Sequence, residues 1–573
     1  MCLTCGCSGE PSKNEGIKET SRALRGTIAE ELGQATPTFA EENVQVLKFH
    51  GVYQQDDRDR RKEARKRGLD RHWQMMIRTR IPGGRVSPEG YLAHDDVARR
   101  WGNGTLRITT RQDFQLHGVL KGDLWSTIHD INEALMTTLG GCGDQVRNVM
   151  CCPAPVADRL RTELQAALPG LVAGLTPTTG AYHEIWIDNE LVDSSRQAEP
   201  EPDELYGATY LPRKFKVGVA VEGDNCIDVY SDDLGLVAMR GRDGGLDGFT
   251  VLVGGGLGRT HNKPDTYPAV ARPLAHVPTN RLVETARAVV AVHRDFGDRS
   301  NRRHARLKYL LADRGLPWFR EQVQSRVCFE LADPRPLRWQ PLDDHLGWHE
   351  QGDGRLFYGL FVENGRIQDV DGMRLRTALR HLVEEHRPVL WMTAQQNLIV
   401  ADVEPARRRE IEAVFREHGV PLTEEVSQTI RNSMACPAIP TCGLAVAEAE
   451  RALPGLIREI ERIADRLGLA DERISYRMTG CPNGCARPYL GDVGFVGTTL
   501  GKYDVHLAGD FLGTRLNEPF ARNVPLVEIP ALLEGPLAAF ADERSGGQGF
   551  GDWCHEVGLD ALRERFAAAE ATA

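Results

Sequence analysis

The sequence lacks the features of a membrane protein and of a small secreted domain. No uninterrupted apolar stretch in its 573 residues reaches the roughly 20 residues that span a bilayer. The first residues, MCLTCGCSGEPSKNEG, contain no apolar segment typical of a secretory signal. The net charge of −11 argues against a general nucleic-acid surface, although it is compatible with locally basic clefts. We therefore expect a soluble, cytoplasmic protein whose thirteen cysteines stay reduced.

A dinucleotide-binding fingerprint is also missing. The segment VLVGGGLGRTHN follows an apolar run, as such a loop would, but Arg259 stands at the third glycine position of the G-x-G-x-x-G pattern. We therefore expect no nicotinamide site in this chain. The three glycines, followed by Arg259 and His261, still offer backbone amides and a cation to an anionic ligand.

Four cysteines in the last third of the chain have an unusual setting. Cys436 and Cys442 lie in MACPAIPTCGLA, and Cys481 and Cys485 lie in MTGCPNGCARPYLG. Thiols that only fill a core need no such glycine- and proline-rich bends, whereas thiolates that bind one inorganic centre do. The pattern predicts the cradle of an iron–sulfur cluster. A structural zinc site fits the five-residue gap less well, and a disulfide framework or a chance group of buried thiols are the remaining alternatives.

The chain contains an internal repeat. VRNVMCCPAP, from Val146, matches IRNSMACPAI, from Ile430, at an offset of 284 residues (430 minus 146), and the same offset lays TTRQDFQL over TAQQNLIV. Two segments that agree at one offset indicate two homologous halves packed about a pseudo-twofold axis. Cys152 matches Cys436, but no partner follows it where Cys442 follows Cys436. We therefore expect only the second half to hold a cluster.

Each half begins with a strand, an amphipathic helix and a second strand, which predicts an α+β fold. In the first half the Ser-Pro pair at 87–88 predicts a helix start. The following segment, LRITTRQDFQLHG, alternates like a single strand with Arg107 and Arg111 on one face. In the second half the Asn-Gly pair at 364–365 predicts a type I′ hairpin ahead of a leucine-rich helix.

Several basic side chains are candidates for binding an anion. LPRKFKVGVAV puts Lys214 and Lys216 on the same face of a predicted strand, for which a solvated face is the ordinary explanation. If Arg78 and Arg147 converge on them, the four cations would repel one another unless an anion neutralised them.

Two further segments carry weaker signals. RDRRKEARKRGLDRH, from Arg58, predicts a solvated helix, with docking of an acidic partner as the second interpretation. Cys2, Cys5 and Cys7 predict an oxidisable N-terminal tail, with metal binding as the weaker alternative.

Taken together, these segments resemble the sirohaem-containing sulfite and nitrite reductases, and most closely the haemoprotein (beta) component of assimilatory sulfite reductases. The resemblance covers almost the whole chain in order, through KNEGIKETSRALRGTIAEEL, KFHGVYQQDDRDRR, RQDFQLHG, RNVMCCPAP, LPRKFKVGVA, GGGLGRTHN, AQQNLIVA and both cysteine motifs. It implies a three-domain fold of α/β layers with a pseudo-twofold repeat of ferredoxin-like modules, one sirohaem and one 4Fe-4S cluster.

The resemblance also implies domain boundaries. An N-terminal arm covers residues 1–78, and duplicated ferredoxin-like half-domains cover 79–145 and 349–421. A first repeat domain that binds sirohaem and substrate covers 146–348, and a second repeat domain that carries the cluster covers 422–573.

Site residues follow from the matching motifs. The cluster ligands implied are Cys436, Cys442, Cys481 and Cys485, and Cys485 is the one that also reaches the sirohaem iron. The substrate-binding cations implied are Arg78, Arg147, Lys214 and Lys216. Segments that contact the macrocycle contain Arg107, Arg111, Gln115, Gln396 and Asn397, and the glycine loop adds Arg259 and His261.

The activity implied is the six-electron reduction of sulfite to sulfide, in sulfur assimilation for cysteine biosynthesis. Relatives specialised for nitrite resemble K-x-N where this chain has Lys214-x-Lys216, so sulfite is favoured, with nitrite as a side substrate. The alternatives are a sirohaem nitrite reductase that produces ammonia, a non-haem iron–sulfur electron carrier and, further off, a zinc-stabilised assembly factor. Electrons must come from a partner, either an NADPH-dependent flavoprotein, which the resemblance favours, or a ferredoxin.

Tyr53 and Cys142 resemble a tyrosine–cysteine pair that is covalently joined in some relatives. A free buried thiol is the interpretation that we favour.

Overall fold

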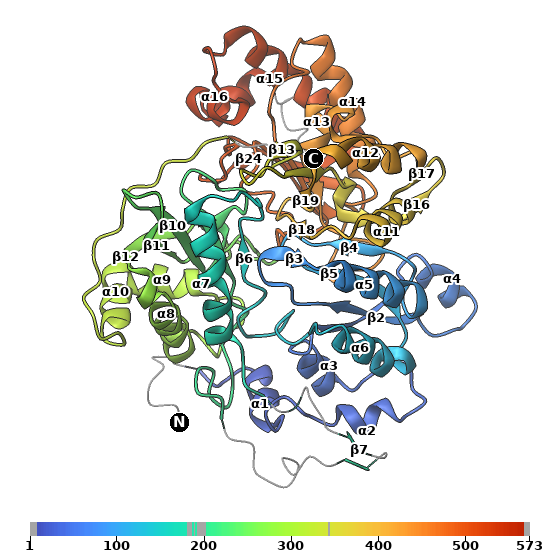
Figure 1. Cartoon of the computed structure of the whole chain (residues 1–573), viewed down its shortest axis with the longest axis vertical. Coiled ribbons are helices and arrows are strands. Elements are labelled where there is room, and N and C mark those ends of the chain that lie inside the picture. The colour runs from blue at the N-terminus through green and yellow to red at the C-terminus, as the bar shows by residue number, and fades with distance from the viewer. Residues whose placement is uncertain are drawn as a thin grey trace.

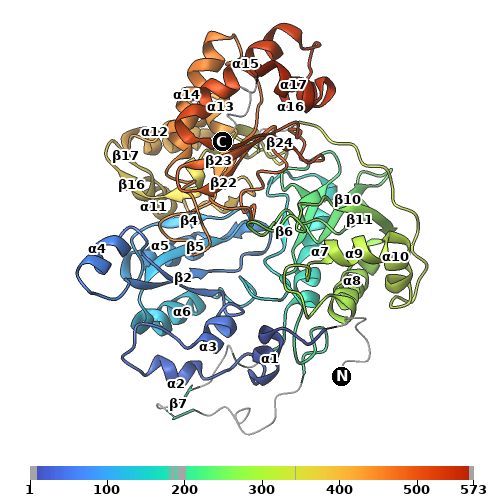
Figure 2. The same ribbon diagram turned by 180° about the vertical axis from the view of Figure 1, so that it is seen from behind.

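The chain folds into lobes that meet at a common centre (Figures 1 and 2). The computed structural model describes residues 9–179, 181, 186–187, 190–191, 202–341 and 344–566. Cys2, Cys5 and Cys7 lie outside the described residues. In the described part, no helix is both long and apolar enough to cross a membrane.

Two five-stranded sheets form the ferredoxin-like halves, which share one hydrophobic core. The first sheet has the strand order β1 (Val52–Asp56), β2 (Trp73–Arg78), β5 (Phe114–Val119), β4 (Leu106–Ile108) and β15 (Arg366–Ile367). The second has the order β13 (Gly347–Glu350), β14 (Leu356–Leu360), β19 (Leu398–Val403), β18 (Leu390–Met392) and β3 (Arg85–Val86). Their helices are α5 (Pro88–Arg100), α6 (Leu124–Glu133), α11 (Leu375–His386) and α12 (Arg408–Glu417).

The two halves exchange their edge strands. β15 comes from the second half and pairs with β4, while β3 comes from the first half and pairs with β18. Gln112 donates to the Met392 carbonyl at 2.9 Å, and Gln396 donates to the Ile108 carbonyl at 3.4 Å. Both contacts connect positions related by the offset of 284 residues (396 minus 112, and 392 minus 108). The pseudo-twofold repeat expected from the sequence is therefore present in the topology.

Two expectations about local structure were wrong. The alternating segment from Leu106 is not one strand, because a turn separates β4 from β5. The Thr109 amide donates to the Asp113 carbonyl at 2.9 Å, and Gln112 has a left-handed φ of 57°. Arg111 therefore lies in a turn. The Asn-Gly pair at 364–365 does have positive φ angles, but the strand that follows it joins the other half's sheet rather than closing a hairpin.

The two repeat domains are each built on another five-stranded sheet with the same mixed pattern, in which three parallel strands are followed by antiparallel ones. The first has the order β12 (Arg272–Val277), β11 (Leu246–Val253), β10 (Leu234–Arg240), β9 (Val217–Val221) and β6 (Met150–Cys151). The second has the order β20 (Ser433–Ala435), β21 (Tyr476–Thr479), β22 (Val493–Thr499), β23 (Lys502–Leu507) and β24 (Glu518–Pro525).

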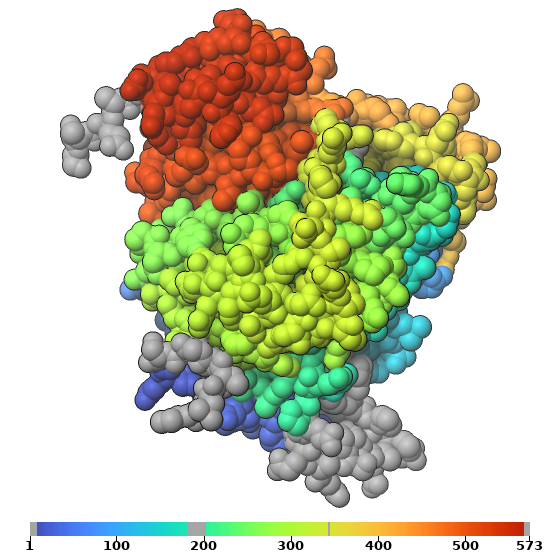
Figure 3. Space-filling model, turned by 90° about the vertical axis from the view of Figure 1, so that its left-hand side faces the viewer, coloured from blue at the N-terminus to red at the C-terminus, as the bar shows by residue number. Residues whose placement is uncertain are grey.

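Helices cover these two sheets. In the first repeat they are α7 (Arg159–Leu175), α8 (Leu282–Phe296), α9 (Leu307–Arg314) and α10 (Leu316–Gln324). In the second they are α13 (Gln428–Arg431), α14 (Leu453–Arg466), α15 (Ile529–Glu543), α16 (Phe550–Val557) and α17 (Leu559–Phe566). After α10 the chain runs over the face of the first repeat toward the upper lobes, as Figures 1 and 3 show.

The N-terminal helices lie along the lower side and at the right-hand edge of the molecule (Figure 1). These helices are α1 (Lys13–Thr20), α2 (Ile28–Leu32), α3 (Glu41–Leu47) and α4 (Arg61–Lys66), and two short hairpins elsewhere are β7 (Trp186–Ile187) with β8 (Glu190–Leu191) and β16 (Asp369–Val370) with β17 (Met373–Arg374). α4 is largely exposed, as expected for the basic segment. β1 and β2 belong to the first ferredoxin-like sheet, so this sheet begins before the expected boundary at residue 79.

Candidate functional site: four cysteines and four cations at the centre

The four cysteines lie after two neighbouring parallel strands. Cys436 follows β20 and Cys481 follows β21, and parallel neighbours end at the same edge of a sheet. The Cys436 amide donates to the Met478 carbonyl at 3.2 Å, which fixes the first loop beside the second strand. The fold thus gathers two motifs that are about forty residues apart in sequence.

Cys485 lies close enough to the other three cysteines to affect their pKa values. Burial and then Cys485 raise the pKa values of the thiols of Cys436, Cys442 and Cys481, that of Cys481 to about 12. Among the residues that the structure describes, these sulfurs do not form a group within 4.8 Å of one another, as the ligands of a single zinc ion would. The open spacing favours a larger centre than one ion.

Polar contacts hold the two cysteine loops. The Gly480 amide donates to Cys436 Sγ at 3.4 Å, and Asn483 Nδ2 donates to Cys481 Sγ at 3.3 Å. Arg58 Nη1 donates to the carbonyls of Cys442 and Ala445 at 3.1 and 2.5 Å. The first residue of the basic segment, Arg58, therefore holds the loop that contains Cys442.

The four predicted cations converge. The Arg147 amide donates to the Phe215 carbonyl at 2.8 Å, which brings Arg147 beside the two lysines. Burial lowers the pKa of Lys214 well below its usual value, and Lys216 and Arg147 lower it further. Arg78 belongs to the same group, because Arg147 and Arg78 both act on the hydroxyl of Tyr53. Such mutual repulsion is costly unless an anion lies among these side chains.

The cations also lie close to the cysteines. Burial and Arg111 lower the pKa of Lys216 to about 7, against an opposing effect of Cys485. Cys485 interacts with Arg78 as well. Cys485 is exposed, although Ala486 and Arg487 beside it are buried.

Tyr53 and Cys142 are neighbours. Burial and Cys142, which is also a hydrogen-bond partner, raise the pKa of Tyr53 to about 12. Arg78 Nη1 lies 3.4 Å from Cys142 Sγ, and Cys142 forms no disulfide. The pair therefore borders the group of four cations.

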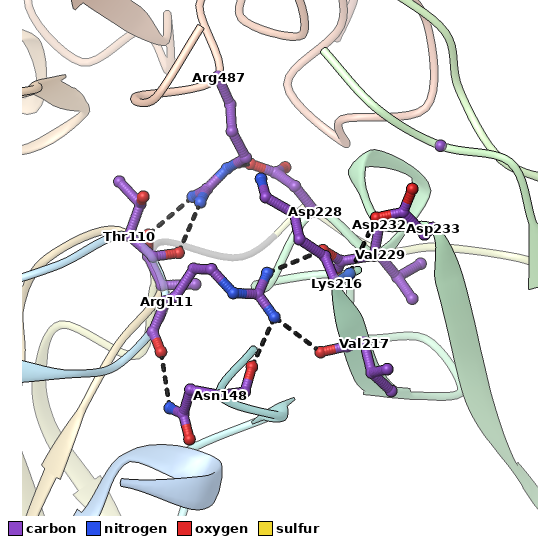
Figure 4. A network of polar contacts seen from close by, with 12 residues as sticks. Thr110, Arg111, Asn148, Lys216, Val217, Asp228, Val229, Asp232, Asp233 and Arg487 are labelled. Carbon is purple, nitrogen blue, oxygen red and sulfur yellow. Dashed lines mark hydrogen bonds and ion pairs between the residues drawn. The ribbon is translucent and has the colours of Figure 1, made fainter. Parts of the chain in front are cut away.

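Two of the predicted macrocycle contacts are bound within the protein. Arg107 pairs with Glu450 at 3.0 Å and donates to the Ala435 carbonyl, next to Cys436, at 2.8 Å. Arg111 pairs with Asp232 at 2.8 Å and donates to the carbonyls of Asn148 and Val217 (Figure 4). These two guanidinium groups therefore hold together the backbone segments around the site.

The amide side chains behave similarly. Gln115 Nε2 contacts Met76 Sδ at 3.3 Å, and Asn397 Nδ2 donates to Asp344 at 2.9 Å. Gln396 crosses to the other half at the pseudo-twofold axis, as described above, and its Oε1 atom is buried without a hydrogen-bond partner.

The glycine loop does not offer all the free backbone amides that the sequence suggested. The amides of Gly254 and Gly256 donate to the carbonyls of Asp233 and Ala269, so these two donors are already used. Lys308 binds the carbonyls of Gly256 and Gly258 at 3.0 and 2.9 Å.

The two side chains that follow the loop are less enclosed. His261 is exposed. Arg259 is half-buried, and its Nε atom is buried without a hydrogen-bond partner.

Several residues of the centre were not predicted. Arg306 pairs with Asp233 at 2.8 Å beside the lysines, and burial raises the pKa of the Asp113 carboxyl to about 7. Arg487 donates to Asp228 at 2.5 Å and to the Thr110 carbonyl at 3.0 Å (Figure 4). The sequence did contain a signal for the Arg306–Asp233 pair. The two aspartates of YSDDLG stand just before a buried strand, and buried carboxylates require cationic partners.

The residues present fit an anionic macrocycle and a cluster. Buried atoms without partners include Nε of Arg78, Arg111 and Arg259. These are donors, as the carboxylates of a macrocycle require. Four thiols at open spacing are the donor set of an iron–sulfur cluster.

Comparisons with known proteins agree with this geometry. The family model described as "Nitrite and sulphite reductase 4Fe-4S domain" matches residues 172–330, and "Nitrite/Sulfite reductase ferredoxin-like half domain" matches residues 71–134 and 349–418. The structure of the NirA protein of Mycobacterium tuberculosis superposes with a TM-score of 0.78 and 24% identity, covering 97% of this chain and 98% of that one, which shows the fold.

Curated relatives match over nearly the full length. The "Sulfite reductase [NADPH] hemoprotein beta-component" of Staphylococcus saprophyticus is 44% identical over 95% of both chains. That of Geobacillus thermodenitrificans is 45% identical over 96% of both. The "Sulfite reductase [ferredoxin]" of Synechococcus elongatus is 45% identical over 96% of this chain and 90% of its own. This chain therefore belongs to the nitrite and sulfite reductase family.

Proposed function

We propose that this chain is the haemoprotein of an assimilatory sulfite reductase and reduces sulfite to sulfide. The observation that carries the proposal is the convergence of Arg78, Arg147, Lys214 and Lys216 beside Cys485. A doubly charged oxyanion among these side chains would offset their mutual repulsion. The relatives that bear the name sulfite reductase match the chain over nearly its whole length, which supports the same assignment.

Two cofactors belong to this proposal. Cys436, Cys442, Cys481 and Cys485 would hold a 4Fe-4S cluster, and Cys485 would also ligate the iron of a sirohaem. Arg259 and His261, beyond the glycine loop, are candidates to bind the macrocycle's carboxylates, together with Gln396 and Asn397. Arg107, Arg111 and Gln115 would act mainly by holding in place the protein segments that surround the cofactors. When bound, the sirohaem supplies an iron that ligates sulfur and the cluster supplies electrons one at a time.

The protein's own residues perform the remaining tasks. Arg78 and Arg147 would orient the oxyanion, because a guanidinium presents forked donors in a fixed plane. Lys216, whose pKa burial lowers to about 7, is suited to donate a proton to a departing oxygen at neutral pH. The surrounding buried residues exclude bulk water, which strengthens each of these interactions.

Substrate preference and electron donor form the finer part of the proposal. Two lysines at Lys214-x-Lys216 suit the higher charge of sulfite, and we assign nitrite as a side substrate. Electrons come from a partner protein, which we assign as an NADPH-dependent flavoprotein, with a ferredoxin as the alternative donor. We keep Cys142 as a free thiol beside Tyr53, and peptide mass spectrometry that finds the two residues cross-linked would correct this.

An absorption spectrum followed by product analysis tests the proposal. We expect isobacteriochlorin bands together with features of a coupled cluster, and sulfide as the product when sulfite is added to the reduced protein. A cluster-only spectrum would instead support an electron carrier. Ammonia from nitrite without sulfide from sulfite would support a nitrite reductase.

A further inference from the structure

A second group of metal-binding side chains lies in the first repeat, away from the four cysteines of the cluster. One ligand atom from each of Cys152, Asp224, Cys226 and His345 lies within 4.8 Å of all the others. Cys152 Sγ is 3.0 Å from Asp224 Oδ2, and His345 Nε2 is 3.1 Å from the same oxygen. Neither cysteine forms a disulfide.

The spacing suits one small ion. In a tetrahedral zinc site with bonds of about 2.0–2.3 Å, the ligand atoms lie about 3.3–3.8 Å apart. Two thiols, an imidazole and a carboxylate are all among the ligands that zinc prefers. The group of four therefore needs only small side-chain movements to enclose an ion, in contrast with the wider group of cluster cysteines.

His345 closes the group of four. Its buried Nε2 atom forms an ion pair with Asp224 Oδ2 at 3.1 Å, so the imidazole and the carboxylate already face each other. The residue also has a left-handed φ of 58°, a backbone conformation that costs energy in a non-glycine residue and tends to occur at functional sites. Its imidazole points into the group of four rather than toward solvent.

Surrounding contacts complete the coordination environment. The Cys226 amide donates to Asp224 Oδ1 at 3.1 Å, which leaves Oδ2 directed at the thiol and the imidazole. Arg161 lies 3.3 Å from Asp224 Oδ2 and is itself held by Asp158 at 2.7 Å. Two thiolates and a carboxylate carry three negative charges, and Zn²⁺ with Arg161 balances them. Such outer contacts orient metal ligands.

An access route is present. A cavity of about 330 Å³ borders the group and is lined in part by Arg161, Asp224, His345 and His349. An ion could thus reach ligands that are otherwise buried.

The ligands come from separate parts of the chain. Cys152 follows β6, Asp224 and Cys226 follow β9, and His345 precedes β13 of the second ferredoxin-like sheet. From the sequence we expected only the second half to hold a cluster, because nothing matches Cys442 after Cys152. The structure supplies partners for Cys152 from distant segments instead.

We propose that Cys152, Asp224, Cys226 and His345 bind one structural Zn²⁺ ion. Four protein ligands leave no open position for substrate, which is the arrangement of a structural rather than a catalytic site. The ion would fasten the connection between α10 and β13 to the sheet of the first repeat. It would thereby join the first repeat to the second ferredoxin-like half.

Metal analysis of the purified holoenzyme tests the proposal. After removal of loosely bound metal, we expect about one zinc per chain in addition to the cluster and haem iron. Zinc-edge X-ray absorption should give two sulfur ligands at about 2.3 Å and two lighter ligands at about 2.0–2.2 Å. Cys226→Ser should weaken zinc binding, measured by competition with a chromophoric chelator, by at least about tenfold. Iron content and the haem spectrum should stay as in the parent protein.

Cys328→Ser is the matched control, because Cys328 is an exposed thiol outside the group, and this variant should keep its zinc. His345→Gln provides a second test that leaves both thiols in place and should also lose zinc. A parent protein that contains no zinc and takes up none from zinc sulfate would overturn the proposal. So would zinc that both Cys226→Ser and His345→Gln retain, or a Cys152–Cys226 disulfide in peptide mass spectrometry of the unreduced protein.

Discussion

At the scale of single residues, two lysines two positions apart carry the proposed choice of substrate. Lys214 and Lys216 flank Phe215, which is fully buried and anchors the segment just before β9. Lys214 lies close enough to Arg147, and Lys216 close enough to Cys485, for the pairs to interact electrostatically. Under the proposal, charge at these two positions, rather than the shape of the fold, would distinguish oxyanions of different charge.

The first prediction concerns this pair. Lys216→Asn should lower the ratio of kcat/KM for sulfite to that for nitrite by about tenfold, equivalent to about 1.4 kcal/mol, because the more highly charged anion loses more attraction. Steady-state kinetics with both anions measures the ratio. Lys502→Asn, at an exposed lysine, should leave it unchanged. An unaltered ratio in Lys216→Asn would contradict the assignment.

The second prediction is a pH dependence. Burial and Arg111 lower the pKa of Lys216 to about 7, so its cationic form is lost as the pH rises through neutrality. With nitrite, which stays ionised throughout, kcat/KM should fall above about pH 7. Lys216→Arg should move this decline to higher pH, because a guanidinium stays protonated.

Asp113 is the competing explanation of such a decline. Its pKa, raised by burial to about 7, lies in the same range, and its deprotonation would also weaken anion binding. A decline that persists in Lys216→Arg but disappears in Asp113→Asn would assign it to Asp113 instead.

At the scale of elements, the sequence predicted which helices and sheets form better than it predicted how the strands pair. The helix after the Ser-Pro pair begins as expected, with Ser87 Oγ accepting from the Gly90 amide at 3.0 Å, because capping is a local interaction. The repeat also predicted the matching sheets. Strand exchange between the halves was not predictable, since the partner of an edge strand depends on tertiary packing rather than on local pattern.

The site shows the same division. The cysteine and lysine motifs could be recognised from the spacing of their residues, because each motif lies within one short segment with a defined local backbone. Arg107 and Arg111 were assigned to the macrocycle, yet their partners Glu450 and Asp232 lie more than 100 residues away. No local pattern encodes ion pairs between distant segments.

The third prediction uses one of these distant pairs. Glu450 binds Arg107 at 3.0 Å and Arg366 at 2.7 Å, and so ties β4 and β15 to the loop after Cys442. Glu450→Gln leaves two largely buried guanidinium groups without a counter-charge and should lower the free energy of unfolding by about 3–5 kcal/mol. Urea denaturation measures this. Glu459→Gln, at an exposed ion pair, should change it by about 0–1 kcal/mol.

Acid conditions give an independent check on Glu450. Although burial opposes it, Arg366 and Arg107 lower the pKa of Glu450 to about 2, below that of an unfolded glutamate. The stabilising contribution is therefore complete above about pH 4.5 and is lost as the pH falls toward 2. Glu450→Gln should unfold with a weaker pH dependence over this interval. An equally steep dependence would mean that other carboxylates dominate.

At the scale of the whole molecule, one buried arginine contacts every major part of the fold. Arg487, two residues after Cys485, donates to Asp228 of the first repeat, to the Thr110 carbonyl and to the Ala394 carbonyl of the two ferredoxin-like halves. Asp228 also binds Arg477 at 2.7 Å. The lobes therefore meet at a charged joint directly beside the proposed bridging cysteine.

The last prediction follows from this joint. Asp228→Asn removes the negative charge that pairs with Arg477 and Arg487, which are both buried. The free energy of unfolding should therefore fall by about 3–5 kcal/mol. Because Arg487 positions the segment of Cys485, iron and sirohaem content per chain should fall together with activity. Glu41→Gln, which breaks the exposed pair with Lys13, should alter neither quantity appreciably. If Asp228→Asn lost stability but kept full cofactor content, the joint would serve folding alone, and the geometry of the cysteine loop would be set within its own sheet.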